Sequence, residues 1–456
     1  MVLEVSMSTV HEDRGAVARS RRGGRWIDRW EPEDPEFWAR EGRRVARKNL
    51  VFSVLAENLG FTVWSLMSIV VVSLGQVGFA FTVGQTFWLL IVPNLVGAVL
   101  RVPYTFAVPR FGGRAWTAFS AGMLLIPCAM LAYAVSTPGT PYWFFLLTAA
   151  TTGFGGGNFS SSMANISFFY PEGKKGLALG LNAAGGNLGV AMVQLVVPIV
   201  ITWGAGINLA YAALVWMPFV VVSTACAWLF MDSLTEARPD GTSYRLAMTN
   251  RHTWVMSLLY IGTFGSFIGF SFAFPSLIKL SFAEQKGFVA LAFLGALIGS
   301  VTRPFGGWLA DRLGGARVTV GVFVGLALGC AGVLVSVETR SFPLFFGSFI
   351  VLFVLTGLGN GSTYRMIPAI FATQVADAAS AKRQAAAVVG IAGAVGAFGG
   401  VLVNLVFKFS LEGGKTLAPA LTAFLGFYAL CVVTTWWFYL RRVSFGRVPS
   451  LAHAGI

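Results

Sequence analysis

The chain has 456 residues, of which 56% are hydrophobic and only 11% are charged. Soluble globular proteins of ordinary composition are less apolar, so this chain is expected to reside in a membrane. Its formal net charge of +14 could indicate a nucleic-acid partner. However, the basic residues gather in alternate connections between hydrophobic segments, as the positive-inside rule requires, and this argues against a nucleic-acid-binding surface.

The first 49 residues are polar and hold 11 Lys/Arg and 9 Asp/Glu, with no apolar core before Leu50. This composition excludes a cleavable signal peptide. Two interpretations remain open for residues 37–48. They form either an interfacial helix, anchored by Trp38 with its arginines facing lipid phosphates, or a solvated segment that leads into the first span.

From residue 50 onward, hydrophobic stretches long enough to cross a bilayer as helices follow one another along the chain. We expect about twelve transmembrane helices and an all-α polytopic membrane protein. The stretches are 50–74, 84–109, 115–136, 142–170, 175–203, 206–231, 253–280, 287–310, 316–336, 341–372, 384–409 and 417–440.

The predicted helices fall into two groups of six, covering residues 50–231 and 253–441. A polar linker, 232–252, with a turn at Pro239-Asp240-Gly241, joins them. The cation-rich connections, the N-terminal segment 1–49 and the tail 442–456 are expected on the cytoplasmic side of the cell (inner) membrane.

The two halves carry a repeat in the same direction. Arg110-Phe111-Gly112-Gly113 and Arg312-Leu313-Gly314-Gly315 are 202 residues apart, and so are Gly157-Asn158 and Gly359-Asn360. Repeats of this kind are typical of transporters that bind substrate near the bilayer midplane, between two halves.

The four cysteines lie inside hydrophobic stretches without metal-ligand spacing, and the three histidines are scattered. These residues suggest no metal site, no cofactor site and no pairing of a nucleophile with a base. We therefore expect a protein that is not an enzyme.

Two arginines lie inside hydrophobic stretches, where a charged side chain costs about 2.5–3.5 kcal/mol on the mildest scales. Arg101 and Arg303 are also 202 residues apart, and each precedes a proline within two residues. Their equivalent places in the two halves predict one central anion site rather than two side chains that reach for the interface.

Several motifs resemble known sequences. Residues 306–317 are similar to the loop motif of the major facilitator superfamily, although Pro109 stands opposite Asp311 in the first half. The glycine-rich stretches 153–165 and 357–368 resemble the two nitrate signatures of the nitrate/nitrite porter family (NarK type) within that superfamily. Their signature residues are Gly155, Gly157, Asn158, Gly359, Asn360 and Gly361.

This resemblance implies the major facilitator fold and a binding site for nitrate, and also for nitrite. The resemblance assigns Arg101 and Arg303 to the substrate, an aromatic pair to its two faces and two polar partners to its edge. The aromatic pair is Phe154 and Phe264, and the polar partners are Asn182 and Tyr260.

Glu57 is an acidic residue inside the first predicted helix, in a pattern that resembles the nitrate/proton symporters of the family. A buried carboxyl group is able to bind and release a proton, so Glu57 is a candidate for proton coupling. A structural pairing with Arg101 or Arg365 is the alternative. Arg365 itself is either a third charge of the site or a structural partner of Glu57 or of a helix end.

The sequence thus predicts a secondary active transporter of nitrate that works by alternating access, with proton symport preferred over nitrate/nitrite antiport. The more remote alternatives are a transporter of another small anion and a nitrate sensor. Nitrate assimilation and nitrate respiration both remain open, and membrane lipid is the other expected partner.

Overall fold

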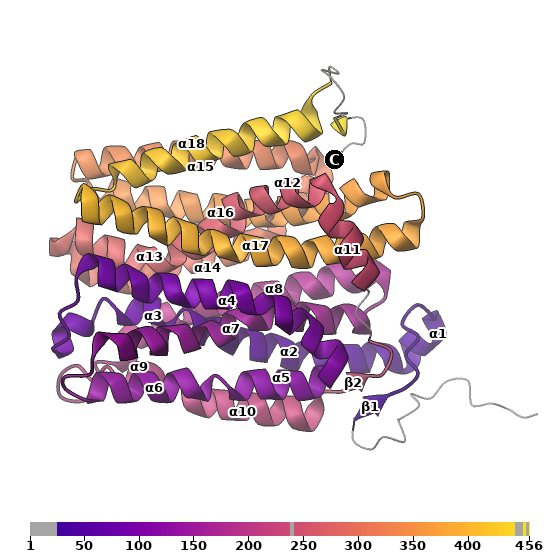
Figure 1. The fold of residues 1–456 in the computed structure, drawn as a ribbon, viewed down its shortest axis with the longest axis horizontal. Coiled ribbons are helices and arrows are strands. Elements are labelled where there is room, and N and C mark those ends of the chain that lie inside the picture. Colours follow the sequence, from indigo (N-terminus) through magenta and orange to yellow (C-terminus); the bar gives the residue numbers. More distant parts are fainter. Residues whose placement is uncertain (1–24, 238–240, 443–449, 453–455) are drawn as a thin grey trace, which may run out of the picture.

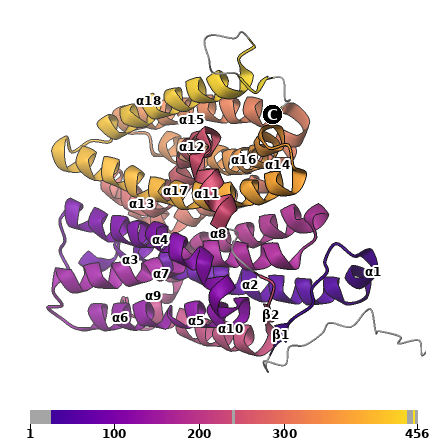
Figure 2. The same cartoon turned by 45° about the vertical axis from the view of Figure 1, so that its right-hand side comes forward.

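The computed structural model describes residues 25–237, 241–442, 450–452 and 456. Nearly all of these residues form helices, and the long helices lie side by side in one bundle (Figure 1). Helices from the first half of the chain fill the lower part of the bundle and those from the second half fill the upper part, which the turned view also shows (Figure 2). The turn expected at 239–241 and most of the tail lie outside the described residues.

The first half contains two short strands and the helices of six predicted spans. They are β1 (Trp26–Ile27), α1 (Pro35–Phe37), a π-helical turn (Trp38–Gly42), α2 (Arg43–Trp64), α3 (Leu66–Val70), a 3-10 turn (Leu74–Val77), α4 (Val83–Phe111), α5 (Gly113–Gly122), α6 (Leu125–Ser136), α7 (Tyr142–Phe169), α8 (Glu172–Val200), α9 (Tyr211–Leu214), α10 (Trp216–Phe230) and β2 (Ser233–Leu234). The strands pair in parallel, with Trp26 opposite Ser233.

The second half contains the remaining helices. They are α11 (Gly241–Thr249), α12 (Arg251–Tyr260), a π-helical turn (Ile261–Gly265), α13 (Ser266–Ser281), a 3-10 segment (Ala283–Ala292), α14 (Phe293–Leu313), α15 (Gly315–Glu338), α16 (Phe342–Gln374), α17 (Ala378–Gly413), α18 (Ala418–Thr435) and a π-helical turn (Trp436–Leu440).

Among the described residues, eleven helical stretches are long and apolar enough to cross a membrane. α7 is a further long helix, and it is rich in glycine, serine and asparagine. It packs against α4 and α2 inside the bundle, where backbone and side-chain polar groups find partners away from lipid. With α7 counted, the fold has the twelve helices that the sequence predicts.

The repeat predicted from the sequence recurs in the geometry of the helix ends. α4 ends at Gly112, with φ 86°, and α14 ends at Gly314, with φ 90°. Both glycines adopt the left-handed backbone region that other residues rarely enter. The two halves also use equivalent packing, because α4 lies against α7 as α14 lies against α16.

Contacts between the halves run along the centre of the bundle, where α4 packs against α17 and α8 packs against α14. Gln194 on α8 donates to the Ser271 carbonyl oxygen over 2.7 Å. Near the end of α13, the Lys279 ammonium donates to the Val72 carbonyl oxygen over 2.6 Å. These contacts hold the halves together and bury the residues between them.

Glycines allow the central helices to approach closely. A Cβ atom at Gly155 on α7 would overlap with the carbonyl oxygen of Gly60 on α2, so Gly155→Ala must push two helices apart. We expect this variant to lower the free energy of unfolding by about 1–3 kcal/mol, and therefore to lower the melting temperature. Gly426→Ala on α18 is the matched control, because nothing lies near its added Cβ. A melting temperature for Gly155→Ala equal to that of the control variant would contradict this packing.

The N-terminal segment 37–48 is helical and continues directly into α2. Its anchor differs from the one expected. Trp38 is buried and packs against Tyr170, with ring centroids 5.6 Å apart, and Lys174 lies over its indole. The tryptophan therefore fixes this segment to the protein, not to lipid.

Candidate functional site

The Arg101 side chain is fully buried at the centre of the bundle. It lies on α4, which begins at a capping box formed by Thr82 and Gln85. Its Nε donates to the Gly156 carbonyl oxygen of α7 over 3.2 Å, and its Nη1 donates to the Gly393 carbonyl oxygen of α17 over 2.6 Å. The guanidinium thus links the two halves of the chain.

Arg303 lies on α14 and is 7% exposed. Its Nη2 donates to the Tyr260 hydroxyl over 3.2 Å. The guanidinium lies 5.0 Å from the centre of the Tyr364 ring, in a cation–π contact. α14 continues through Pro304, as α4 does through Pro103.

A group of aromatic rings connects the two arginines. The guanidinium carbon of Arg101 lies 4.5 Å from the centre of the Phe159 ring and 5.1 Å from that of Phe264. These two rings stack with centroids 6.2 Å apart. Phe264 also stacks on Tyr260 at 5.2 Å and an interplanar angle of 9°. Tyr260 therefore touches both Phe264 and the Arg303 side chain.

Each arginine retains one buried nitrogen without a hydrogen-bond partner in the described part of the chain, Nη2 in Arg101 and Nη1 in Arg303. Buried charged donors are normally satisfied, because an unpaired one loses its hydration without compensation. Two such donors at the centre of the bundle therefore suit an oxyanion that accepts from both guanidiniums.

Glu57 is fully buried on α2, beside this cluster. Ser162 Oγ donates to its Oε2, and Asn182 Nδ2 donates to the same oxygen over 2.5 Å. Its partners are thus a hydroxyl and an amide, rather than Arg101 or Arg365. Its Oε1 is buried and without a partner among the described residues.

A short path of side chains leads from Glu57 to Arg101. Phe61 follows Glu57 by one turn on α2, and its ring lies 6.1 Å from that of Phe159. Phe159 in turn contacts the Arg101 guanidinium. On α7, Ser162 stands three residues after Phe159, so both side chains lie on one face of the helix.

Four of the six predicted substrate-binding residues come together: Arg101, Arg303, Tyr260 and Phe264. Phe154 and Asn182 do not join their cluster. The ring that stacks on Phe264 belongs to Phe159, while Phe154 is only half-buried. Five residues rotate a side chain by about 140° around a helix, so the two phenylalanines of α7 point in different directions.

Asn182 belongs to the Glu57 group, and a second asparagine of α8 stands seven residues before Gln194. Asn187 is fully buried, and both polar atoms of its side chain are without a partner in the described ranges. It shares a helix face with Gln194, which bonds to Ser271 of the second half. Neither Phe159 nor Asn187 was predicted from the sequence, although Phe159 stands in the glycine-rich stretch 153–165 and Asn187 stands in another, 178–189.

The signature residues serve mainly close packing. A Cβ atom at Gly157 would meet the Tyr104 ring, one at Gly359 would meet Thr263, and one at Gly361 would overlap with the Arg303 carbonyl oxygen. The signatures therefore place α7 and α16 against the arginine-bearing helices. Some buried side-chain atoms of the signature asparagines lack a hydrogen-bond partner among the described residues. They are Oδ1 and Nδ2 of Asn360 and Oδ1 of Asn158.

Arg365 is not a charge of the central site. Its side chain is 59% exposed, and its Nε pairs with Asp311 Oδ1 at the end of α14. Both partners have uncharged counterparts in the first half, Met163 and Pro109. The pair therefore joins α14 to α16 in the second half alone, and of the alternatives left open for Arg365 the structure supports the partner of a helix end.

Among the residues that the structure describes, no group of His, Cys, Asp or Glu side chains could hold a metal ion. Cys128, Cys330 and Cys431 are buried, and Cys226 is half-buried.

Comparisons with known proteins show the family of this chain. The family model described as Major Facilitator Superfamily matches residues 50–404. The nitrate/nitrite transporter NarU of Escherichia coli is 40% identical over 455 residues, which cover 93% of this chain and 98% of that protein. This chain belongs to the nitrate/nitrite porter family of the major facilitator superfamily. Another member, the probable nitrate/nitrite antiporter NarK2 of Thermus thermophilus, is 35% identical and covers 92% of the chain and 97% of its own length.

Solved structures of the superfamily share the fold of this porter at low sequence identity. A D-xylose–proton symporter matches with a TM-score of 0.66 and 14% identity, covering 86% of this chain and 97% of its own. A bacterial homologue of the lysosomal transporter Spinster, in an inward-facing occupied conformation, matches with a TM-score of 0.61 and 14% identity, covering 85% and 95%. At this identity the likeness shows the fold alone.

Proposed function

We propose that this protein is a secondary active transporter of nitrate, and also of nitrite, across the cell membrane. The observation that carries the proposal is the pair of buried guanidiniums, each with an unpaired donor, set among stacked aromatic rings. The names of the relatives, nitrate/nitrite transporter and nitrate/nitrite antiporter, support the same substrates. A transporter with these parts performs no covalent chemistry and needs no cofactor.

The chemistry of nitrate suits this cluster. Nitrate is a planar monoanion at physiological pH and cannot cross lipid in a neutral form. Charge-assisted hydrogen bonds from Arg101 Nη2 and Arg303 Nη1 would offset the cost of its desolvation. We propose that the Phe159 and Phe264 rings form the walls of a flat slot for the anion, and that the unpaired Asn187 amide is a further donor. Nitrite is also planar and smaller, whereas sulfate and phosphate are tetrahedral.

We propose that alternating access arises from rocking of the six-helix halves, 50–231 and 253–441, about this site, with 232–252 as the linker. The basic loops and both termini face the cytoplasm in this proposal. Because Arg101 binds the Gly393 carbonyl oxygen of the opposite half, a change in its hydrogen bonds on anion binding would alter a contact between the halves. Substrate binding would thereby be coupled to their relative motion.

For coupling, we prefer nitrate/proton symport over nitrate/nitrite antiport. With no anion and an ionised Glu57, the three buried charged groups sum to one positive charge. With nitrate bound and Glu57 protonated, they again sum to one positive charge. The negative charge of nitrate favours protonation of a nearby carboxyl group, so the two ligands assist each other. Empty and loaded forms would then reorient at similar electrostatic cost.

Antiport is the second candidate. If Glu57 remains ionised throughout, the loaded site is neutral and the empty site is positive. The neutral loaded form would then reorient at lower electrostatic cost than the charged empty form, and this difference favours exchange of one anion for another. The hydroxyl and amide that both donate to Glu57 Oε2 are compatible with a permanent carboxylate.

The structure and the sequence resemblance make different predictions for the aromatic slot. We expect Phe159→Ala to raise the KM for nitrate about threefold to thirtyfold, because the ring contacts both Arg101 and Phe264. Phe154→Ala on the same helix is the matched variant and should change KM less than twofold. Uptake rates of both variants at several nitrate concentrations, normalised to the amount of protein, provide the comparison. A larger effect at Phe154 would restore the assignment made from the sequence.

A competition series in proteoliposomes tests the proposed substrate. Uptake of labelled nitrate should be inhibited by nitrite and by other small planar monoanions, and not by sulfate or phosphate at equal concentration. Equal inhibition by tetrahedral anions would contradict the flat slot and favour a transporter of another small anion. Absence of nitrate flux above that of protein-free vesicles would favour a sensor.

A further inference from the structure

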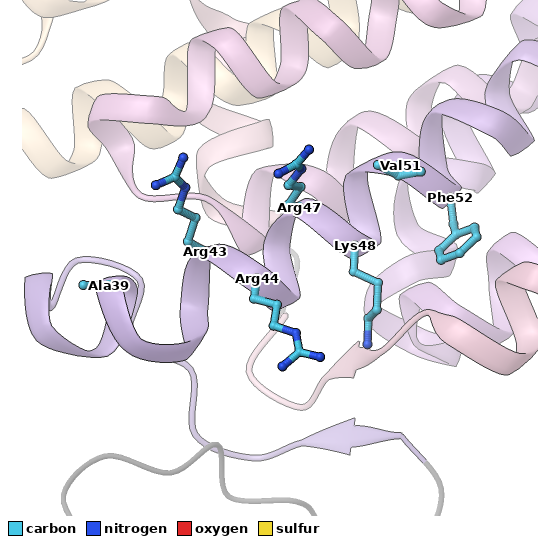
Figure 3. Close-up of a pocket in the computed structure, with 7 residues that line it drawn as sticks. All are labelled: Ala39, Arg43, Arg44, Arg47, Lys48, Val51 and Phe52. Atoms are coloured by element: carbon cyan, nitrogen blue, oxygen red, sulfur yellow. The ribbon is translucent and has the colours of Figure 1, made fainter.

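The strongest concentration of positive charge outside the centre lies on the first turns of α2. A pocket of about 490 Å³ there is lined by Ala39, Arg43, Arg44, Arg47, Lys48, Val51 and Phe52 (Figure 3). All but Ala39 come from about the first three turns of α2. The substrate proposal does not involve any of these residues.

The lysine of this pocket is neutralised, and the arginines are not. Lys48 Nζ lies 2.5 Å from Asp232 Oδ2, and Arg25 lies 3.8 Å from the same carboxyl group. Within the described ranges, no acidic side chain pairs with Arg43, Arg44 or Arg47, which are all exposed. Figure 3 shows Arg43 and Arg47 pointing to one side of the helix and Arg44 to the other. Among the residues that the structure describes, the pocket therefore carries three arginines without an acidic partner.

Beyond the arginines the same helix face becomes apolar. Val51 is 54% exposed and Leu55 is 37% exposed, one and two turns further into the hydrophobic span. The Phe52 ring stacks on that of Phe230 of α10, at 5.2 Å, and forms an apolar wall. The Cα positions of Arg47 and Val51 are thus about 6 Å apart along the helix axis. A charged residue therefore stands one turn before a surface that is suited to hydrocarbon.

We propose that this pocket binds the phosphodiester headgroup of an anionic phospholipid, with an acyl chain along Val51 and Leu55. Guanidiniums are the preferred partners of phosphate oxygens, and basic clusters at the cytoplasmic end of a span attract anionic lipids. That the pocket lies at the cytoplasmic end of the first span, at the level of the lipid headgroups, rests on the proposed cytoplasmic placement of the N-terminal segment. A free phosphate ion would use the arginines but gain nothing from the apolar wall, so the lipid is the favoured ligand.

The lipid would also stabilise a structural junction. The pocket lies where α2, the end of α10 and the linker meet, because Asn49 donates to Asp232 Oδ2 over 3.1 Å and accepts from the Asp232 backbone N–H. A headgroup at this place would hold the first helix and the start of the linker together. Its binding is a property separate from nitrate binding, so the two proposals can fail independently.

The test is native mass spectrometry of the full chain, stripped of lipid in neutral detergent and titrated with phosphatidylglycerol or phosphatidylcholine. We expect one phosphatidylglycerol to bind preferentially to the wild-type protein. The triple variant Arg43→Gln, Arg44→Gln, Arg47→Gln should bind it about tenfold more weakly or worse. The control variant, with the same loss of charge at exposed residues elsewhere, is Arg245→Gln, Arg317→Gln, Lys382→Gln, and it should retain wild-type affinity.

Three outcomes would overturn the proposal. Equal binding of phosphatidylcholine would show that the anionic headgroup is not recognised. An equal loss in the control variant would reduce the effect to net charge. Displacement of the lipid by millimolar inorganic phosphate would assign the pocket to a free anion. Because the three arginines are exposed, the melting temperature of the lipid-free variant should match the wild type, which separates loss of binding from loss of folding.

Discussion

Replacing Arg101 with glutamine is expected to abolish nitrate uptake, with the initial rate in proteoliposomes falling about 100-fold or more. The guanidinium is fully buried and supplies one of the two unpaired donors at the centre of the bundle. Removing one partner of a buried, hydrogen-bonded charge pair typically costs about 2–5 kcal/mol. Arg340→Gln, at an exposed arginine in a loop, should transport nitrate at the wild-type rate.

Arg101→Lys is the more specific test, because it keeps the positive charge and removes the planar guanidinium with its several N–H donors. The native side chain donates from Nε to the Gly156 carbonyl oxygen and from Nη1 to that of Gly393, and it still has Nη2 free. A lysine ammonium on a flexible stem cannot place donors at all three positions. We therefore expect the lysine variant to be nearly as inactive as glutamine. Uptake within twofold of wild type would mean that a point charge suffices at this position.

The second large effect is expected for Glu57→Gln under a proton gradient. Glutamine occupies the same volume and cannot take up a proton, so nitrate entry driven by protons into nitrite-free vesicles should fall at least about tenfold. Exchange of external nitrate for internal nitrite should continue, because the two arginines are unchanged. The measurement is nitrate uptake with an imposed pH gradient, with nitrite either present or absent inside the vesicles.

Glu338→Gln is the matched control for this experiment, since that carboxyl group is exposed at the end of α15. It should leave both modes of uptake unchanged. If wild-type uptake requires internal nitrite and does not respond to the pH gradient, the protein is an exchanger. Glu57 would then serve only to hold Ser162 and Asn182 between α2, α7 and α8.

Much of this architecture could be predicted from the sequence, because the bilayer restricts which backbone structures can span it. Long apolar stretches can only be helices there, and a buried arginine is too costly to be incidental. The matching positions of Arg101 and Arg303 in a repeat then predict one site. The structure adds that Gly112 and Gly314 end equivalent helices in the same backbone conformation.

The details that sequence reasoning missed concern rotation around a helix. Phe154 and Phe159 stand in one glycine-rich stretch, and Asn182 and Asn187 stand in another, each pair five residues apart. In long helices of almost uniform apolarity, hydrophobic periodicity does not indicate which member of such a pair faces the centre. The role of Arg365 stayed open in the sequence for a different reason, since its partner Asp311 lies 54 residues away along the chain.

A structure of the protein determined by cryo-electron microscopy or crystallography in the presence of nitrate tests the central claim most directly. We expect a planar anion that accepts hydrogen bonds from Arg101 Nη2 and Arg303 Nη1 and lies against the Phe159 and Phe264 rings. The same density should be absent from the Arg101→Gln variant. Nitrate bound elsewhere, or a central site that stays free of anion at saturating nitrate, would contradict the account.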